Sequence, residues 1–268
     1  QLLDGRARRA PTLICASDGN HGLAVAEGAR LAGAAARIFL PADLPPVRSE
    51  RIRACGAEVA LVQGDYDDAV EAALQAAAGG AGLLIPDTSG DPDDPVVADV
   101  MSGYDLMAEE IAGQLEAPPT HVFLQAGVGG LAAALAEGLA RRLPDGPRVV
   151  VVEPDRAACV GSALQAGRLV QLEGDLHTSA EMLSCGRASA PALRILLRHG
   201  AQAVAVEEDV LEAAPDALTA HGGPRSTPSG AAGLAGLLRA ADDQPLRQAL
   251  GLTAASRVLL VASEAPPQ

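Results

Sequence analysis

The stretch Ser17-Asp18-Gly19-Asn20-His21-Gly22 lies between a short apolar segment and a longer alanine-rich segment. The apolar residues 12–16 predict a buried strand, and residues 23–31 predict a helix. This order places unpaired backbone N–H groups and short polar side chains at the start of a helix, where the helix dipole favours an anionic or polar ligand. A second interpretation fits the same pattern: Ser17 or Asp18 caps the helix, and no ligand binds. We name this segment the 17–22 turn.

The composition limits the classes of function open to the chain. Its 268 residues are 49% hydrophobic, which is enough for one large core or two smaller ones. A formal net charge of -14 argues against a nucleic acid or an anionic membrane as partner. The four cysteines are far apart, which favours a reducing cytoplasm over a disulfide framework or a zinc site. No apolar run reaches the length of a membrane span, and no signal peptide is visible.

Short apolar runs alternate with helical segments along the whole chain, which predicts parallel sheets flanked by helices. The continuous apolar run at residues 149–152 is typical of a strand buried on both faces. Residues 97–115 predict one helix after a loop rich in Gly, Pro and Asp, and a second series of strands and helices begins after Pro118-Pro119. We therefore expect an α/β protein with a smaller domain at residues 12–110 and a larger one at residues 1–11 and 111–268.

A second glycine-rich segment, Gln125-Ala126-Gly127-Val128-Gly129-Gly130-Leu131, connects a predicted strand to an alanine-rich helix. Small residues and exposed N–H groups at a helix start form a phosphate-binding loop. Residues 127–132 also fit the dinucleotide pattern G-x-G-x-x-A, and Glu153 ends the next strand, where an acid would bind the ribose. A dinucleotide-binding domain is expected to carry this loop after its first strand, but here a full series of strands and helices precedes the loop. The dinucleotide alternative also leaves the 17–22 turn unexplained. A glycine turn that only packs helix on strand is a third interpretation.

The Ser-x-Gly-Asn-His-Gly motif of the 17–22 turn resembles the asparagine loop of the fold-type II pyridoxal-phosphate (PLP) enzymes, the tryptophan synthase β-like family. The form with Asp18 is most similar to the diaminopropionate ammonia-lyases. Further segments similar to those of the family follow in the same order along the chain: Asp87-Thr88, the loop at residues 125–131, Glu153-Pro154-Asp155, Cys185-Gly186 and residues 226–233. In the last of these segments, Thr227 and Pro228 replace a Gly and a Glu of the family.

This resemblance implies a PLP-dependent lyase that removes ammonia from 2,3-diaminopropionate and forms pyruvate. It implies that Asn20 binds the 3′-oxygen of the cofactor, that Ser263 binds the pyridine nitrogen, and that Asp18 is a second base serving the D-substrate. The residues expected to bind the cofactor phosphate are Gly127, Val128, Gly129 and Gly130. Serine or threonine dehydratases are the nearest enzymatic alternative. The family also implies a small amino acid as substrate and a homodimer.

The chain contains no lysine, because all 20 of its basic residues are arginine. The Schiff-base lysine of the family is expected before the 17–22 turn and therefore cannot be assigned. Gln1 and the abrupt end after Ala265 favour an N-terminally truncated ammonia-lyase that is also cut short at its C-terminus. The alternative is a non-catalytic paralogue that still binds PLP or another anion. In either case we expect the chain as given to be inactive.

Overall fold

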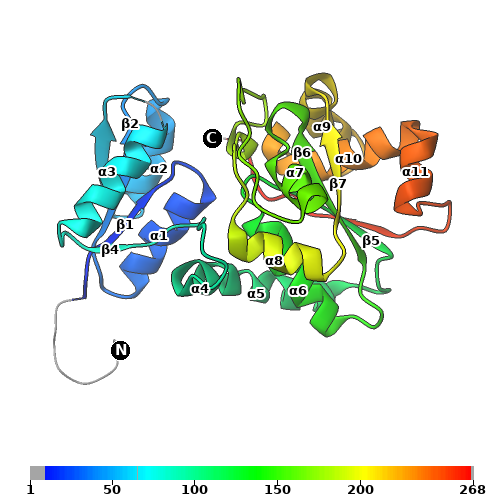
Figure 1. Cartoon of the computed structure of the whole chain (residues 1–268), viewed down its shortest axis with the longest axis horizontal. Coiled ribbons are helices and arrows are strands. Elements are labelled where there is room, and N and C mark those ends of the chain that lie inside the picture. Colours follow the sequence, from blue (N-terminus) through cyan, green and yellow to red (C-terminus); the bar gives the residue numbers. More distant parts are fainter. Residues whose placement is uncertain (1–9, 65, 267–268) are drawn as a thin grey trace. The chain divides into compact units, whose positions relative to one another are not determined.

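The computed structural model describes residues 10–64 and 66–266 (Figure 1). Residues 1–9, 267 and 268, which the sequence analysis assigned to the larger domain, lie outside the described residues. The strands are β1 (Leu13–Ala16), β2 (Ala36–Pro41), β3 (Glu58–Val62), β4 (Leu83–Leu84), β5 (His121–Gln125), β6 (Arg148–Pro154), β7 (Gln202–Val206) and β8 (Val258–Leu260). The helices are α1 (Asn20–Leu31), α2 (Pro46–Ala54), α3 (Tyr66–Ala78), α4 (Pro95–Gly103), α5 (Asp105–Gln114), α6 (Gly130–Arg142), η1 (Asp155–Ala157), α7 (Cys159–Ala166), η2 (Glu181–Leu183), α8 (Ala190–Arg198), α9 (Glu208–Ala220), α10 (Pro228–Asp242) and α11 (Gln244–Leu250).

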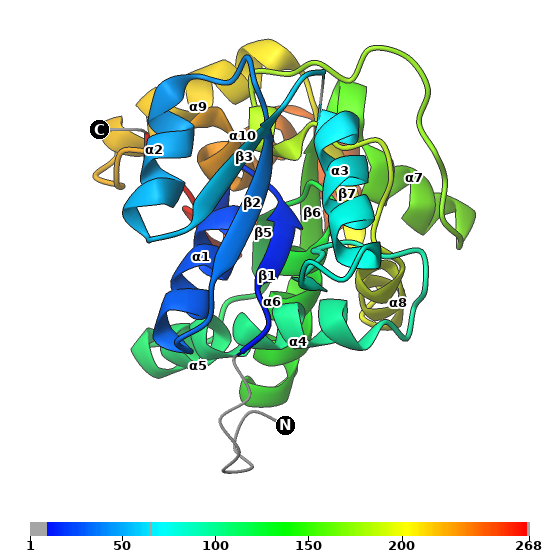
Figure 2. The same ribbon diagram turned by 90° about the vertical axis from the view of Figure 1, so that its left-hand side faces the viewer.

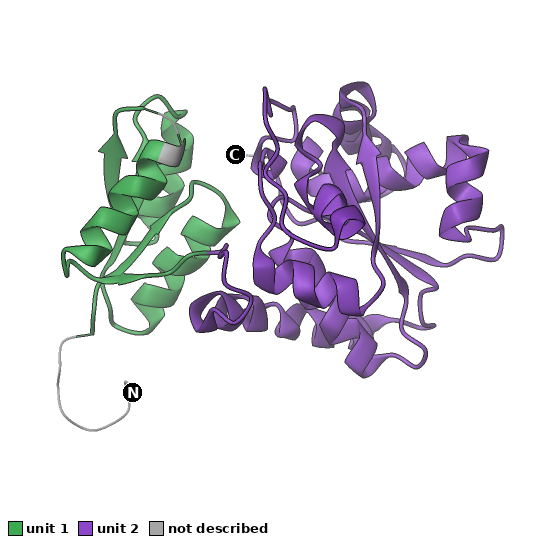
Figure 3. Ribbon diagram, viewed as in Figure 1, with its two compact units in different colours: residues 1–86, 267 green, residues 87–266, 268 purple. Residues whose placement is uncertain are grey.

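The chain forms two compact units, a first unit that ends at Pro86 and a second unit, Asp87–Pro266 (Figure 3). This division differs from the boundary near residue 110 that we expected. The reason is that α4 and α5 belong to the second unit, because Val97, Met101 and Ala108 are buried in one cluster with Ala132 and Leu135 of α6. The loop before α4, rather than the end of α5, therefore marks the division.

Each unit contains a four-stranded sheet, and every pair of neighbouring strands in the two sheets is parallel. In the first unit, α1 and α2 cover one face of the sheet, and α3 covers the other (Figure 2). In the second unit, α6 and α8 pack on Val122 and Leu124, whereas α10 packs on Phe123 from the opposite face. The predicted α/β class with parallel sheets and flanking helices is confirmed.

The strand β6 is buried from Val149 to Pro154, as its continuous apolar sequence predicted. Its residues alternate between two cores, since Val149 and Val151 face one cluster and Val150 and Val152 face the other. The single helix predicted over residues 97–115 is wrong, because the chain forms α4 and α5 with a break at Tyr104. The break directly follows Gly103, because glycine is a poor helix former. At the break, the N–H of Tyr104 donates to the carbonyl oxygen of Met101, three residues back.

Both sheets have the same strand order relative to the chain, β3-β2-β1-β4 and β7-β6-β5-β8. In each sheet the chain begins at an inner strand, adds two strands on one side and then crosses to the other side. The order therefore reverses beside β1 in the first unit and beside β5 in the second. Ligands of open parallel sheets bind outside the carboxyl ends of the strands at such a reversal. Both glycine-containing turns of the sequence lie there.

Candidate active site

The 17–22 turn connects β1 to α1 at the carboxyl end of the sheet of the first unit. The N-cap of α1 is Gly19, so the helix begins at Asn20 rather than at Leu23. The N–H of Gly19 donates to Ser17 Oγ at 3.4 Å, which folds the Ser17 side chain over the turn. Asp18 is therefore not the N-cap that one interpretation of the sequence proposed, and its carboxylate has another partner.

That partner is Arg48 of α2, whose Nη1 lies 2.7 Å from Asp18 Oδ2. The side chains are 22% and 15% exposed for Arg48 and Asp18 respectively, so the ion pair is partly shielded from water. The pair fixes the position of the Asp18 carboxylate on the turn. Arg48 was not predicted, because no local motif distinguishes it from the other arginines in this segment.

The backbone of the 17–22 turn is closely packed. A Cβ atom added at Gly22 would lie 1.9 Å from Ser17 O, so glycine is required where the helix folds back on the turn. His21 Nε2 is 2.8 Å from Ile85 O, which ties the turn to the chain just after β4. Asn20, the first residue of α1, is exposed. The turn is thus a fixed backbone that carries Asp18 and Asn20.

The second glycine turn connects β5 to α6, and we name residues 127–130 the glycine loop. Gly129 is the N-cap of α6 with a φ of 95°, a left-handed conformation that favours glycine. A Cβ atom at Gly127 would lie 3.0 Å from Cys185 Sγ, and one at Gly129 would lie 3.2 Å from Val160 Cγ2. The loop is therefore a cradle of main-chain atoms.

The carbonyl groups of this loop are held by neighbouring groups. Cys159 Sγ donates to Gly127 O at 3.3 Å, and the N–H of Ser189 donates to Val128 O at 2.9 Å. Gly130 begins α6, whose first N–H groups have no intrahelical acceptor, as in every helix. A dianionic phosphate fits such a loop, because N–H groups and the positive end of the helix dipole both attract it.

Glu153, at the carboxyl end of β6, is almost fully buried, with 1% of the residue exposed. Its Oε1 and Oε2 accept hydrogen bonds at 2.7 Å from the N–H groups of Val160 and Gly161 in α7. Burial raises the pKa of the carboxyl to about 7, although these two hydrogen bonds oppose the shift. Both oxygens are thus bound to backbone, which counts against the dinucleotide alternative, in which this acid binds ribose hydroxyls.

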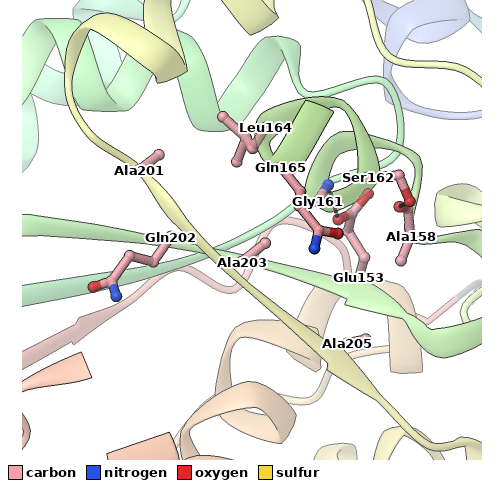
Figure 4. A pocket seen from close by; sticks show the side chains of 10 residues that line it. All are labelled: Glu153, Ala158, Gly161, Ser162, Leu164, Gln165, Ala201, Gln202, Ala203 and Ala205. Atoms are coloured by element: carbon pink, nitrogen blue, oxygen red, sulfur yellow. Dashed lines mark hydrogen bonds between the residues drawn. The ribbon is translucent and has the colours of Figure 1, made fainter. Parts of the chain in front are cut away.

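A pocket of about 560 Å³ lies between α7 and β7, beside Glu153 (Figure 4). Its lining consists mostly of small side chains, among them Ala158, Gly161, Ala203 and Ala205. A Cβ atom at Gly161 would lie 3.1 Å from Glu153 Oε2 and 3.0 Å from Ala203 Cβ, so glycine is what allows α7 to approach the strand.

Ser263 follows β8, which pairs in parallel with β5. Since the carboxyl ends of parallel strands meet at one edge, Ser263 and the glycine loop lie at the same edge of this sheet. Gln125, the last residue of β5, donates from Nε2 to Ser263 Oγ at 2.5 Å. Gln125 belongs to the predicted loop motif, but no role was predicted for it.

The segment in which Thr227 and Pro228 replace a Gly and a Glu begins α10. Thr227 is the N-cap and its Oγ1 accepts from the N–H of Gly230 at 3.0 Å, while Pro228 occupies the first helical turn. Thr227 Oγ1 also lies 2.5 Å from Glu264 Oε2, which it binds as a donor. The replacements thus give this helix a well-formed start.

Cys185, near the glycine loop, is partly buried, and burial raises the pKa of its thiol to about 12.

Comparison with known proteins agrees with this geometry. The sequence model of the pyridoxal-phosphate-dependent enzyme family matches residues 1–264. The chain belongs to this family. Diaminopropionate ammonia-lyase of Escherichia coli K12 is 32% identical to it over 247 residues, which are 89% of this chain and 62% of the relative. A biosynthetic L-threonine dehydratase of Haemophilus influenzae is 31% identical over 86% of this chain and 43% of the relative.

Solved structures of pyridoxal-phosphate-dependent enzymes have the same fold. The E. coli diaminopropionate ammonia-lyase, in complex with an aminoacrylate-PLP azomethine reaction intermediate, has a TM-score of 0.84 and 29% identity, and the match covers 97% of this chain and 69% of that one. The processed form of threonine deaminase isoform 2 from Solanum lycopersicum has a TM-score of 0.81 and 25% identity, over 98% of this chain and 69% of that one. The resemblance to the diaminopropionate ammonia-lyases and the fold-type II architecture are confirmed.

The cofactor of the family is pyridoxal phosphate, and the glycine loop fits its phosphate, because Gly130 begins α6 and the first N–H groups of that helix have no intrahelical acceptor. Within the described residues, no group of three or more His, Cys, Asp or Glu is arranged to hold a metal ion. Among the described residues, no helix is long and apolar enough to cross a membrane. The chain spans 62% of the length of its E. coli relative.

Proposed function

We propose that this protein is a PLP-dependent lyase that eliminates ammonia from 2,3-diaminopropionate and yields pyruvate and ammonia. The observation that carries the proposal is the Asp18 carboxylate, fixed on the 17–22 turn by Arg48 at 2.7 Å. An acid at this position of the turn is the feature in which the sequence resembles the ammonia-lyases most closely. The similarity of the chain to diaminopropionate ammonia-lyase over 89% of its length supports the same substrate.

The cofactor phosphate is assigned to the glycine loop, to the backbone of Gly127, Val128, Gly129 and Gly130. Main-chain N–H groups at the start of α6 would bind the phosphate oxygens. Ser263 donates a hydrogen bond to the pyridine nitrogen, and Asn20 binds the 3′-oxygen. When bound, the cofactor supplies an electron sink that stabilises negative charge at Cα of the substrate.

Asp18 is assigned as the base that removes the Cα proton of the D-substrate. Because Arg48 Nη1 binds Oδ2, we assign the proton-accepting role to Oδ1. Arg48 keeps the carboxylate in one orientation, so little reorganisation is needed when the proton is transferred.

For these 268 residues alone we propose cofactor binding without turnover. They include no lysine, so no side chain carries the primary amine with which PLP enzymes bind the cofactor covalently. Ammonia-lyase activity then requires a lysine from outside these residues. Treatment of the PLP-loaded chain with borohydride, followed by mass spectrometry of its peptides, tests this point: no side chain should retain the cofactor. A stable cofactor adduct on a side chain would contradict it.

The substrate is tested by pyruvate release from D- and L-diaminopropionate and D- and L-serine, and by 2-oxobutanoate release from L-threonine, measured on the protein encoded by the complete native gene. We expect diaminopropionate to have the highest kcat/KM. The variant Asp18→Asn should lose roughly 10²–10⁴-fold with the D-isomer and much less with the L-isomer. A higher kcat/KM for serine or threonine would favour the dehydratase alternative, which the similarity to L-threonine and D-serine dehydratases supports.

A further inference from the structure

Gln125 is a buried side chain directly before the glycine loop, and 3% of it is exposed. Its Nε2 atom lies 3.2 Å from Gly230 O, 3.0 Å from Val261 O and 2.5 Å from Ser263 Oγ. Gln125 therefore links three segments that are far apart in the sequence: the end of β5, the start of α10 and the chain that follows β8. The proposed function gives Ser263 a role but leaves Gln125 without one.

The neighbours of this amide determine the direction of its hydrogen bond to Ser263. Carbonyl oxygens can only accept, so the amide atom beside Gly230 O and Val261 O must be the nitrogen. An amide nitrogen carries two hydrogens and can only donate; the 2.5 Å contact takes one of them and the two carbonyl oxygens share the other, so Ser263 Oγ is the acceptor in its contact with Gln125. A serine hydroxyl has one hydrogen. That hydrogen consequently points away from Gln125.

The packing of α10 keeps Gln125 in this position. A Cβ atom at Gly233 would lie 2.8 Å from Phe123 O and 3.4 Å from Gln125 Oε1, so only glycine lets the helix come this close to the amide. A Cβ atom at Gly230 would lie 2.6 Å from Glu264 O. The start of α10 thus packs closely against both Gln125, which is buried, and the segment that carries Ser263.

We propose that Gln125 is a positioning residue that makes the Ser263 hydroxyl a hydrogen-bond donor toward the pyridine nitrogen of the cofactor. This inference rests on the proposed binding of PLP at the glycine loop and Ser263. A donor hydroxyl matches a ring nitrogen that bears a lone pair and no proton. Gln125 therefore selects the unprotonated form of the ring, although it does not touch the cofactor.

The test compares equilibrium binding of PLP with that of its N-methylpyridinium derivative, whose ring nitrogen cannot accept a hydrogen bond. The measured quantity is the ratio of the two Kd values, because a general loss of affinity cancels in it. We express the result as the Kd of the derivative divided by the Kd of PLP. This ratio should be about tenfold higher for the wild-type chain than for Ser263→Ala, because the variant lacks one hydrogen bond to the ring nitrogen. Gln125→Met should move the ratio at least threefold toward that of Ser263→Ala, whereas Gln248→Met, on the exposed face of α11, should leave it unchanged.

A second variant, Gln125→Glu, replaces the donor by an acceptor to which Ser263 donates its own hydrogen, and it should lower the ratio at least as far as Gln125→Met. Circular dichroism verifies that each variant is folded. A wild-type ratio in both Gln125 variants, together with a lowered ratio in Ser263→Ala, would overturn the role of Gln125 and leave PLP binding intact. If the wild-type chain does not bind PLP, the proposed cofactor site itself is wrong.

Discussion

Glu153 gives the protein a residue whose ionisation opposes folding. In the folded chain its pKa is about 7, whereas the ordinary value is 4.5. The folded state thus keeps a proton that the unfolded chain releases, and the resulting stabilisation is complete below pH 4.5 and is lost as the pH rises through 7. We expect the free energy of unfolding of wild type, relative to Glu153→Gln, to fall by about 2–3 kcal/mol between pH 5 and pH 8.

Urea unfolding of both proteins at the two pH values measures this difference. Glu212→Gln, an exposed position on α9, is the matched control and should follow wild type at every pH. Glutamine also places an amide nitrogen against one of the two N–H groups of α7, but this cost does not depend on pH. Parallel curves for wild type and Glu153→Gln would show that the carboxyl does not titrate in this range.

At the scale of residues, the sequence proposes candidate site residues but not the contacts between them. Asp18, Asn20 and the residues of the glycine loop were proposed because turns after strands have a local pattern of Gly and short polar residues. The partner of Asp18 is 30 residues away, and Gln125 and Ser263 are separated by 138 residues. Such pairs depend on how the strands are ordered in the sheet, which no local pattern specifies.

At the scale of elements, the glycine loop depends on one left-handed residue. Gly129→Ala places a Cβ atom at a φ of 95° and 3.2 Å from Val160 Cγ2. We expect a loss of about 1–3 kcal/mol of stability, measured by urea unfolding, and a weaker affinity for inorganic phosphate. Gly113→Ala in α5, where an added Cβ meets nothing within 4 Å, should be neutral or stabilising. Equal stability of the two variants would mean that the loop relaxes without cost.

Strands were predicted well where a short apolar run stands out in the sequence. The runs at residues 12–16 and 149–152 correspond to β1 (Leu13–Ala16) and to the centre of β6 (Arg148–Pro154). The break between α4 and α5 was missed, because Gly103 and Tyr104 occur inside a pattern that is otherwise helical. The earlier start of α1 was missed because Asn20, His21 and Gly22 are poor helix formers whose place is fixed by contacts with Ser17 and Ile85.

At the scale of the whole molecule, the second unit has cores of its own. Two clusters of buried side chains, one on each face of its sheet, lie wholly within Asp87–Pro266. We expect a protein of residues 87–266 to fold alone, with a cooperative urea transition and slow amide exchange in β5 and β6. A gradual transition without protected amides would mean that this unit depends on the remainder of the chain.

The strand order shared by the two sheets places two turns at equivalent points of two units whose sequences show no repeat. The turn of the first unit presents side chains, the carboxylate of Asp18 and the amide of Asn20. The turn of the second unit presents main chain, since it is built from Gly127, Val128, Gly129 and Gly130. The turn after the first strand of each sheet therefore presents side chains in one unit and main-chain groups in the other. A substitution in the first turn exchanges a side chain that the turn presents, whereas a substitution in the second acts chiefly through the shape of the backbone.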